Sequence, residues 1–338
     1  MAKSHFHLHN HPDNSHLRWS AAIPPVLTVP SGSEITLELP DGGGNQITRE
    51  NAAAGTAISA FDVSKADPGI GPIYIEDAAP GDVLRVDFLA IEPTADYGWT
   101  GVFPGFGILR DDAEFVGGGG APKIYDLGRP GEKNWVADTG YVVFRAGDRE
   151  RREEEIRIPY RPFLGLVGVA PAEGEHSMIP PRDTGGNMDT RALGVGSSLY
   201  LPVEVAGALL SLGDGHAAQG DGEVCGTAIE TRMRATVRVT VEKGKKAWVK
   251  SPWVLTAEPD AKPAGREFMC LGIDADLAAA TRKAVRGVVD WLQAEKALGR
   301  EEAYMLASVA GNLRMCEVVD MPNYAVGVSR DLGSMTDD

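Results

Sequence analysis

The chain has 338 residues, of which 43% are hydrophobic and 24% are charged, and its formal net charge is −15. This composition is typical of a globular protein and excludes a disordered or fibrous chain. The acidic balance argues against a broad surface for nucleic acid or an anionic membrane, because such surfaces need clustered Lys and Arg. A small neutral partner is compatible with it.

The first half of the chain predicts β structure. Apolar and polar residues alternate over residues 25–44, 71–93 and 141–148, between clusters of Gly, Pro, Asp and Ser. Glycine and proline are dense over residues 104–123, which predicts an extended loop. The charged run "RREEE" at 151–155 is expected on a solvated face or at a hairpin tip. Short strands joined by turns predict a sandwich or a barrel.

The second half predicts a mixture of helices and strands. Residues 201–216 suit a short helix that ends at Gly213, and residues 232–257 suit a hairpin with its turn at 242–244. Residues 274–299 form the clearest helix, with Asp274 and Asp276 at its start and Gly299 as its stop. The tail from residue 329 is expected to fray.

The fold class expected is therefore mainly β with a few helices (α+β), built as sandwich-like or barrel-like lobes with one long helix near the C-terminus. We divide the chain into a flexible histidine-rich segment (1–15), an N-terminal β-rich lobe (16–160), a C-terminal α+β lobe (161–330) and a tail (331–338). Edge strands need covering, so we expect a homodimer or a higher homo-oligomer.

Cysteine usage and hydropathy predict a cytoplasmic location. The three cysteines are Cys225, Cys270 and Cys316, an odd number without a CxxC pair, which favours a reducing compartment over a disulfide framework. No apolar run has the length of a signal peptide or of a membrane span.

Reactive side chains gather among small residues in "GDGHAAQGDGEVCGTAIE", residues 213–230. If residues 221–229 are extended, Asp221, Glu223, Cys225 and Thr227 share one face. Asp214 and His216 lie just upstream, and a turn at Gly220 would fold them over that face. Imidazole and carboxylate ligands suit Zn²⁺, purely oxygen ligands suit Ca²⁺, and an unligated carboxylate can deprotonate a water. The alternative is an acidic turn region, since Asp and Gly are the commonest turn residues.

The same segment resembles the signature of the acetamidase/formamidase family. Further blocks similar to that family follow its order: "PPVLTVPSG", "LPDGGGNQIT", "GPIYIEDAAPGDVLRVDFLAIEP", "RPFLGLVGVAP" and "GGNMDTRALGVGSSLYLPV". The resemblance spans residues 16–330. It implies a mostly β fold, an amidase that acts on linear C–N bonds, and a metal-containing site. "PPRDTGGNMD" departs from the pattern, with Asp183 and Thr184 where many relatives have a histidine.

The resemblance, together with the spacing of the motif, suggests roles for the following residues. Glu223 and Asp221 are the expected catalytic residues; the expected metal ligands are His216, Asp214, Asp41 and Asp189; the expected substrate-binding residues are Gln46, Asn187, Gln219 and Glu230. The expected cofactor is a divalent metal, Zn²⁺ first and Ca²⁺ second. The expected substrate is a short amide such as formamide or acetamide.

Two other hypotheses stay open. One is a non-catalytic β protein that binds a small molecule and holds a structural Ca²⁺. The other is an amidase with Cys225 as the nucleophile, although the acidic residues expected beside this thiol would raise its pKa and favour a structural role.

Several side chains outside the motif have possible roles in a site. The N-terminal histidines His5, His7, His9 and His11 suggest at most adventitious metal binding, whereas His16 is a candidate for the main site. Trp19, Trp99 and Trp135 are expected in the core or along a pocket.

Overall fold

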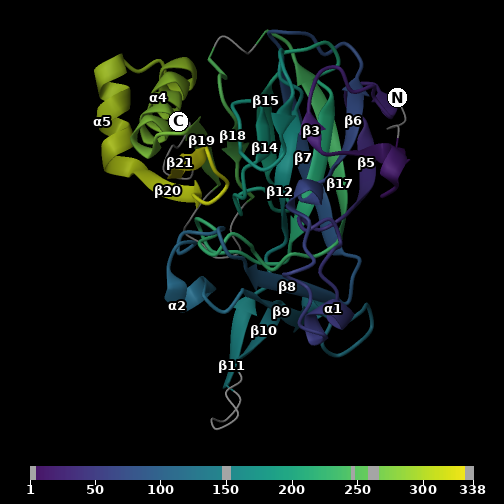
Figure 1. The fold of residues 1–338 in the computed structure, drawn as a ribbon. Helices are drawn as coiled ribbons and strands as arrows, with labels where there is room; N and C mark the ends of the chain where they lie inside the picture. Colours follow the sequence, from purple (N-terminus) through teal and green to yellow (C-terminus); the bar gives the residue numbers. More distant parts are fainter. Residues whose placement is uncertain (1–4, 147–153, 245–247, 258–265, 332–338) are drawn as a thin grey trace.

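The computed structural model describes residues 5–146, 154–244, 248–257 and 266–331, and it is built mainly of strands with few helices, as predicted (Figure 1). Two large sheets pack face to face and are not closed into a barrel. The predicted fold class is thus confirmed, and of the two predicted architectures, a sandwich and a barrel, the structure has an open sandwich.

The larger sheet contains strands from both predicted lobes. Its order is β1 (His5–Leu8), β5 (Glu34–Leu39), β17 (Met233–Glu242), β7 (Val83–Pro93), β15 (Ser198–Pro202), β18 (Trp253–Leu255), β19 (Glu267–Asp274), β21 (Tyr324–Asp331) and β20 (Gly311–Glu317). Strand β17 lies between β5 and β7 and is antiparallel to both. The two predicted lobes therefore share this sheet.

The smaller sheet carries the first part of the motif. It consists of β14 (Gly185–Asn187), β12 (Phe163–Val169), β16 (Leu210–His216), β6 (Gly69–Ile75) and β2 (Ser15–His16) in this order, with β4 (Leu27–Val29) also paired to β6. Leu212 of β16 and Val167 of β12 are fully buried in the same cluster as Leu37 of β5 and Phe88 of β7. This shared apolar core joins the two sheets.

The helix predicted over residues 201–216 is wrong, because the segment contributes β15 and β16. Every residue of β16 is buried, and the strand pairs with β12 and β6 on its two sides. The mostly apolar run over residues 205–212 suits a buried strand as well as it suits a helix. Gly213 fits this position because a Cβ there would lie 2.6 Å from the carbonyl oxygen of Pro68.

The hairpin predicted over residues 232–257 is also wrong, although both of its strands exist. Strands β7 and β15 lie between β17 and β18. Alternate residues of β17, among them Val237 and Val239, are fully buried. The alternation therefore located the strand correctly but did not identify its partners.

Two helices cover one end of the larger sheet (Figure 1). Helix α4 (Leu277–Lys296) begins as predicted, since the Asp276 side chain accepts a hydrogen bond of 2.6 Å from the Ala279 amide. It ends at Lys296 with Ala297 in the left-handed region, and Gly299 instead caps the start of α5 (Arg300–Ala310). The buried residues of α4 pack in one cluster with residues of β19 and β21.

A smaller lobe holds the remaining segments. It contains the pairs β8 (Tyr97–Val102) with β9 (Ala121–Asp126) and β10 (Tyr141–Ala146) with β11 (Glu154–Pro159), and the short helices α1 (Arg49–Ala53), α2 (Ala113–Val116) and α3 (Val136–Thr139). The predicted loop at 104–123 is irregular except for α2 and the start of β9. Of the run at 151–155, residues 151–153 lie outside the described residues.

Both ends of the described chain lie in strands. Strand β1 pairs in parallel with β5, and the His5 ring nitrogen Nε2 lies 3.0 Å from Thr36 Oγ1. The histidine-rich segment is thus anchored to the sheet over residues 5–8. Residues 329–331, predicted to fray, belong to β21, and residues 332–338 lie outside the described residues. The short pair β3 (Arg18–Trp19) and β13 (His176–Ser177) completes the strands.

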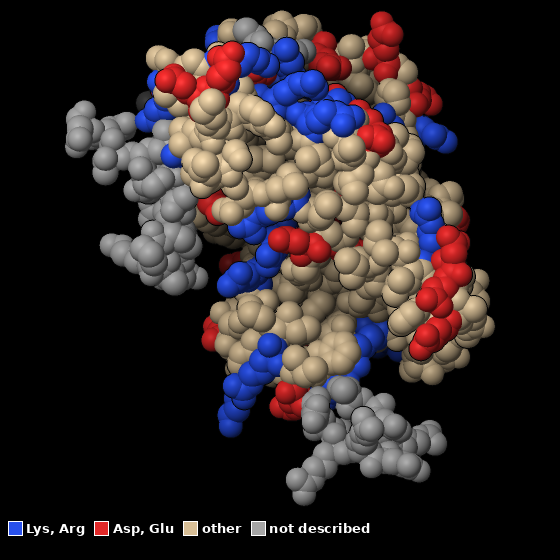
Figure 2. Space-filling view, turned by 90° about the vertical axis from the view of Figure 1, so that its left-hand side faces the viewer, with Lys and Arg blue, Asp and Glu red and all other residues tan. Residues whose placement is uncertain are grey.

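The face formed by α5 and the edge strand β20 exposes large apolar side chains. Tyr304, Met305, Val309 and Leu313 all lie more than half exposed there. Figure 2 views the molecule from the side on which α5 lies, where uncharged surface surrounds several groups of Lys, Arg, Asp and Glu side chains. Self-association stays a prediction, which light scattering at micromolar concentration tests.

Within the described ranges, no helix combines the length and apolarity needed to cross a membrane.

Candidate active site

The motif folds back on itself after β16. The segment predicted to be extended, residues 221–229, instead turns repeatedly, with φ of 46° at Glu223 and 88° at both Gly222 and Gly226. The predicted common face of Asp221, Glu223, Cys225 and Thr227 is therefore wrong. The Ala217 amide donates to the carbonyl of Ile229 at 2.9 Å, which brings Glu230 opposite His216.

Four carboxylates surround the His216 imidazole. Its Nε2 lies 3.0 Å from Asp214 Oδ1, 3.1 Å from Glu230 Oε2 and 3.9 Å from Glu223 Oε1. Its Nδ1 lies 4.0 Å from Asp189 Oδ1. All five side chains are buried. We call these five residues the acidic cluster.

Small residues around the acidic cluster let the backbone approach its carboxylates. A Cβ on Gly165 of β12 would collide with Asp214 and Asp189, and a Cβ on Gly42 would collide with Asp214. Asp189 itself adopts φ of 40°, which turns the chain directly after β14. The glycines of the site therefore serve close packing against charged groups.

Burial and mutual repulsion control the ionisation of the acidic cluster. Burial raises the pKa of Glu223 and of Asp189 well above the usual range, and neighbouring carboxylates raise both further. Burial likewise raises the pKa of Glu230 to about 7. Burial alone would lower the pKa of His216, but Asp214 and Glu230 raise it well above its ordinary value. The site therefore favours a positive charge at its centre.

These shifts predict that the metal-free protein loses stability as the pH rises. The pKa of Glu230 is about 7 in the folded protein and 4.5 for an ordinary Glu side chain. Folding therefore favours the protonated form of Glu230 between these two pH values, and this contribution to stability is lost as the pH rises through them. The raised pKa of His216 acts in the same direction, since its charged form stabilises the fold at low pH. We expect the Tm of chelated protein to be several degrees higher at pH 5 than at pH 8. Calorimetry at both values checks this; an equal or higher Tm at pH 8 would contradict it.

Several polar atoms of the site are buried without a hydrogen-bond partner. They include both carboxylate oxygens of Asp189, Nδ1 of His216 and Oδ1 of Asn187. Unpaired buried polar atoms destabilise a fold by about 1–3 kcal/mol each, so they are rare unless something else binds there. Two overlapping groups, Asp189, His216 and Glu223 and Asp214, His216 and Glu230, each offer ligand atoms within 4.8 Å of one another.

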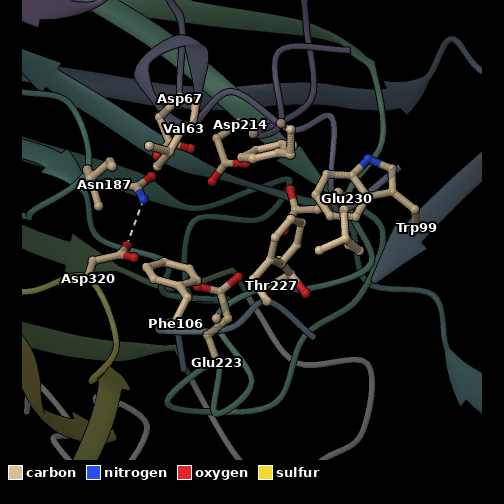
Figure 3. Close-up of a pocket in the computed structure, with 18 of the residues that line it drawn as sticks. Val63, Asp67, Trp99, Phe106, Asn187, Asp214, Glu223, Thr227, Glu230 and Asp320 are labelled. Atoms are coloured by element: carbon tan, nitrogen blue, oxygen red, sulfur yellow. Dashed lines mark hydrogen bonds between the residues drawn. The ribbon is translucent and has the colours of Figure 1, made fainter. Parts of the chain in front are cut away.

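The acidic cluster borders a cavity of about 380 Å³. Figure 3 shows Asp67 and Asp214 on one side of it, with Glu223 and Phe106 opposite. The polar lining consists of Asp67, Asn187, Asp214, Glu223, Thr227, Glu230 and Asp320. The rest of the wall is mainly glycine, aromatic and aliphatic. The lining therefore combines carboxylates with apolar side chains.

Two of the lining carboxylates were missed by sequence reasoning. Asp67 precedes the "PGIGP" stretch, and Asp320 accepts a hydrogen bond of 2.7 Å from Asn187 Nδ2. Burial raises the pKa of both well above the usual range, with further contributions from nearby carboxylates. Neither belongs to the motif, and only the sheet topology brings them to it.

Some predicted site residues lie beside the cavity without lining it. Asp41 accepts hydrogen bonds from the Asn45 amide (2.8 Å) and Trp99 Nε1 (3.3 Å), and burial raises its pKa to about 6. Gln46 is bonded to the backbone at Gly43 and Asp62. Both side chains hold the 41–46 loop in place.

Two further predicted residues, Gln219 and Asp221, also have structural contacts. Gln219 donates to the carbonyl of Asp189 at 2.5 Å and thus supports that ligand candidate. Asp221 faces outward, 36% exposed, and pairs with Arg191 at 2.7 Å. The structure therefore separates Asp221 from the acidic cluster.

The secondary candidates also lie outside the acidic cluster. His16 is bonded to the Arg18 carbonyl and, at 2.7 Å, to Ser211 Oγ. Asp183, at the departure from the family pattern, pairs with Lys283 at 3.8 Å. Among the tryptophans, Trp99 lines the cavity, while Trp19 and Trp135 pack in the core.

Cys225 is half-buried and does not line the cavity of the acidic cluster. Its Sγ lies 3.4 Å from the carbonyl oxygen of Thr227. Cys270 and Cys316 are buried, and burial raises the pKa of Cys316 to about 12.

Replacing Cys225 should therefore affect stability more than turnover. We expect Cys225→Ser to keep turnover within about tenfold and to change the unfolding free energy by about 1 kcal/mol. Steady-state kinetics and chemical denaturation of the variant check this. Complete loss of turnover with intact folding would instead support a thiol nucleophile.

Comparisons with known proteins identify the family. The model of the Acetamidase/Formamidase family matches residues 3–174 and 172–331. A formamidase of Methylophilus methylotrophus is 29% identical over 91% of this chain and 86% of its own length. An acetamidase of Mycolicibacterium smegmatis is 32% identical over 68% of this chain and 66% of its own length.

A solved structure agrees with this assignment. The crystal structure of an acetamidase from Bacillus halodurans superimposes with a TM-score of 0.81 at 30% identity, and the match covers 97% of this chain and 98% of that one. Sequence blocks, fold and the family match thus extend over nearly the whole chain. It belongs to the acetamidase/formamidase family.

Proposed function

We propose that the acidic cluster is the site at which this amidohydrolase splits the C–N bond of a small neutral amide, giving a carboxylate and ammonia. The observation that carries the proposal is the burial of four carboxylates around His216 at one end of a cavity, with acceptor atoms left unpaired. Buried groups with strongly shifted pKa values are the usual components of a catalytic site.

A divalent cation fits this set of side chains. Carboxylates that burial and repulsion destabilise, together with an imidazole and unpaired oxygens, favour a bound positive charge. We propose that Asp214, His216 and Glu230 hold it, with Asp189 on the other side of the imidazole. Such a cation polarises a carbonyl group and lowers the pKa of a water. The imidazole favours zinc over calcium, which prefers oxygen ligands.

Glu223 is the proposed proton shuttle. It lines the cavity and lies within the cluster, and burial raises its pKa well above the usual range of a carboxyl group, which makes its carboxylate a stronger base. Its carboxylate takes the proton from the attacking water as the new C–O bond forms. It then delivers that proton to the amide nitrogen as the C–N bond breaks, and ammonia leaves.

Asn187 and Asp67 are proposed to position the amide. Asn187 keeps its Oδ1 free of hydrogen bonds while its Nδ2 is bonded to Asp320, so the oxygen is available to an amide N–H. Asp67 faces the cavity from the opposite wall to Glu223 (Figure 3). The proposed reaction gives no step to Asp221 or to Cys225.

Release of ammonia tests the function directly. Purified protein with its metal content measured would be incubated with formamide, acetamide and propionamide, and ammonia would be followed over time. We expect turnover of at least one of the three. Protein that binds a cation but releases no ammonia from any amide would instead support the non-catalytic binding alternative.

A further inference from the structure

We infer that the cavity takes primary amides with a bulky apolar acyl group, of the size of a phenylalkyl chain, in preference to formamide or acetamide. The inference rests on the proposed function, because it names the substrate class of the same site.

The cavity is too large for the smallest amides. Its volume is about 380 Å³. A water molecule takes up about 30 Å³, so acetamide, with four heavy atoms, fills on the order of 120 Å³ on the same scale. Well over half of the space would then remain without substrate contacts. Ligands of well-formed sites are usually largely buried by them, so the space indicates a larger substrate.

The cavity also has an apolar wall. Two segments supply most of it, residues 58–63 after α1 and residues 103–106 after β8. The ring centroids of Phe61 and Phe103 lie 4.9 Å apart, and those of Trp99 and Phe103 lie 6.2 Å apart. The large apolar residues of the lining are Ile58, Phe61, Val63, Trp99, Phe103, Phe106 and Ile179. Such a wall strengthens binding only if the substrate brings apolar surface to it.

Apolar side chains are also exposed close to this wall in the sequence. Val63, which lines the cavity, is 63% exposed, and Ile108, two residues beyond Phe106, is 52% exposed. The Ile108 amide donates to the carbonyl of Val224 at 2.9 Å, and Val224 is itself 63% exposed. The segments that supply the wall therefore also present apolar side chains to solvent.

The carboxylates that line the cavity orient the amide. Glu223, Glu230 and Asp67 offer carboxylate oxygens, which when ionised accept hydrogen bonds and cannot donate them. An unsubstituted amide nitrogen brings two N–H donors to these carboxylates. A bulky group on the nitrogen would instead place apolar surface among carboxylates. We therefore expect the bulky apolar group on the acyl side of the amide, where it contacts the apolar wall.

A pair of isomeric substrates tests both parts of the inference. The values of kcat/KM for acetamide, 3-phenylpropanamide and N-benzylacetamide would be measured on the metal-loaded protein. Each buried methylene is worth about fourfold, so we expect 3-phenylpropanamide to exceed acetamide at least tenfold. Its isomer N-benzylacetamide, with the same atoms but the ring on the nitrogen side, should be at least tenfold poorer than 3-phenylpropanamide.

The outcomes separate this inference from the proposed function. Acetamide hydrolysed as well as 3-phenylpropanamide would overturn the inference and leave the function intact. N-benzylacetamide hydrolysed equally well would overturn the orientation. No hydrolysis of any of these amides, formamide included, would overturn the proposed function itself.

A substitution in the apolar wall supplies a second test. Val63→Trp narrows the cavity, and we expect it to lower the ratio of kcat/KM for 3-phenylpropanamide over acetamide at least tenfold. A ratio measured on one preparation cancels any difference in the folded fraction. Val309→Trp, the same change at an 82% exposed position of α5, should leave the ratio within twofold. An unchanged ratio in Val63→Trp would overturn the assignment of the wall.

Discussion

Replacing Glu223 with Gln is expected to lower turnover by roughly 10² to 10⁴ while the bound cation is retained. The amide of Gln preserves the shape of the side chain but cannot take a proton from water. Glu223 is buried and lines the cavity, and its Oε1 lies 3.9 Å from His216 Nε2. Ammonia release and metal analysis of the same preparation measure both quantities.

Asp221→Asn is the matched control for this substitution. It makes the same chemical change two residues away, on a side chain that is 36% exposed and paired with Arg191. We expect its turnover to stay within about threefold of the unmodified protein, because surface ion pairs contribute little. If Asp221→Asn lost activity and Glu223→Gln kept it, the proton shuttle would be assigned to the wrong carboxylate.

Replacing His216 with Ala is expected to abolish cation binding and turnover together. The imidazole lies at the centre of the acidic cluster, and its removal leaves Asp214 and Glu230 facing each other across a buried gap. Both carboxylates then repel without a compensating group, so we also expect the variant to be less stable. Metal content, turnover and Tm of the purified variant check the three effects.

His176→Ala serves as the control for the loss of an imidazole. The His176 ring is hydrogen-bonded to the carbonyl of Glu173 at 2.8 Å, and it does not line the cavity. This variant should keep its cation and its turnover. A His216→Ala protein that is folded, active and metal-loaded would show that the imidazole is not a ligand.

The sequence predicted strands better than it predicted their partners. Alternation identified β5 and β17 because each has one buried and one more exposed face. It could not place β7 and β15 between β17 and β18, since pairing between distant strands depends on the core that both sheets share. Strand β16 is buried along its whole length, so its burial does not alternate, and the mostly apolar run over residues 205–212 that leads into it resembled a helix.

For the site, too, the sequence predicted residues that lie close together in the chain and missed those that come from distant segments. Asp214, His216, Glu223 and Glu230 lie within one motif, and the structure brings all four together, although through turns instead of a strand. Asp67 and Asp320 come from distant loops whose sequence gives no sign of the motif. Asp41 and Gln46 lie near it in space, but hydrogen bonds to neighbouring groups occupy their side chains.

Titration of metal-free protein with zinc tests the central claim most directly. Ammonia release from an amide substrate would be recorded as Zn²⁺ is added in steps below one equivalent per chain, with Glu223→Gln titrated in parallel. The proposal predicts that turnover rises in proportion to bound zinc and that Glu223→Gln binds the same amount while staying nearly inactive. Full turnover by the chelated protein before any zinc is added would contradict it.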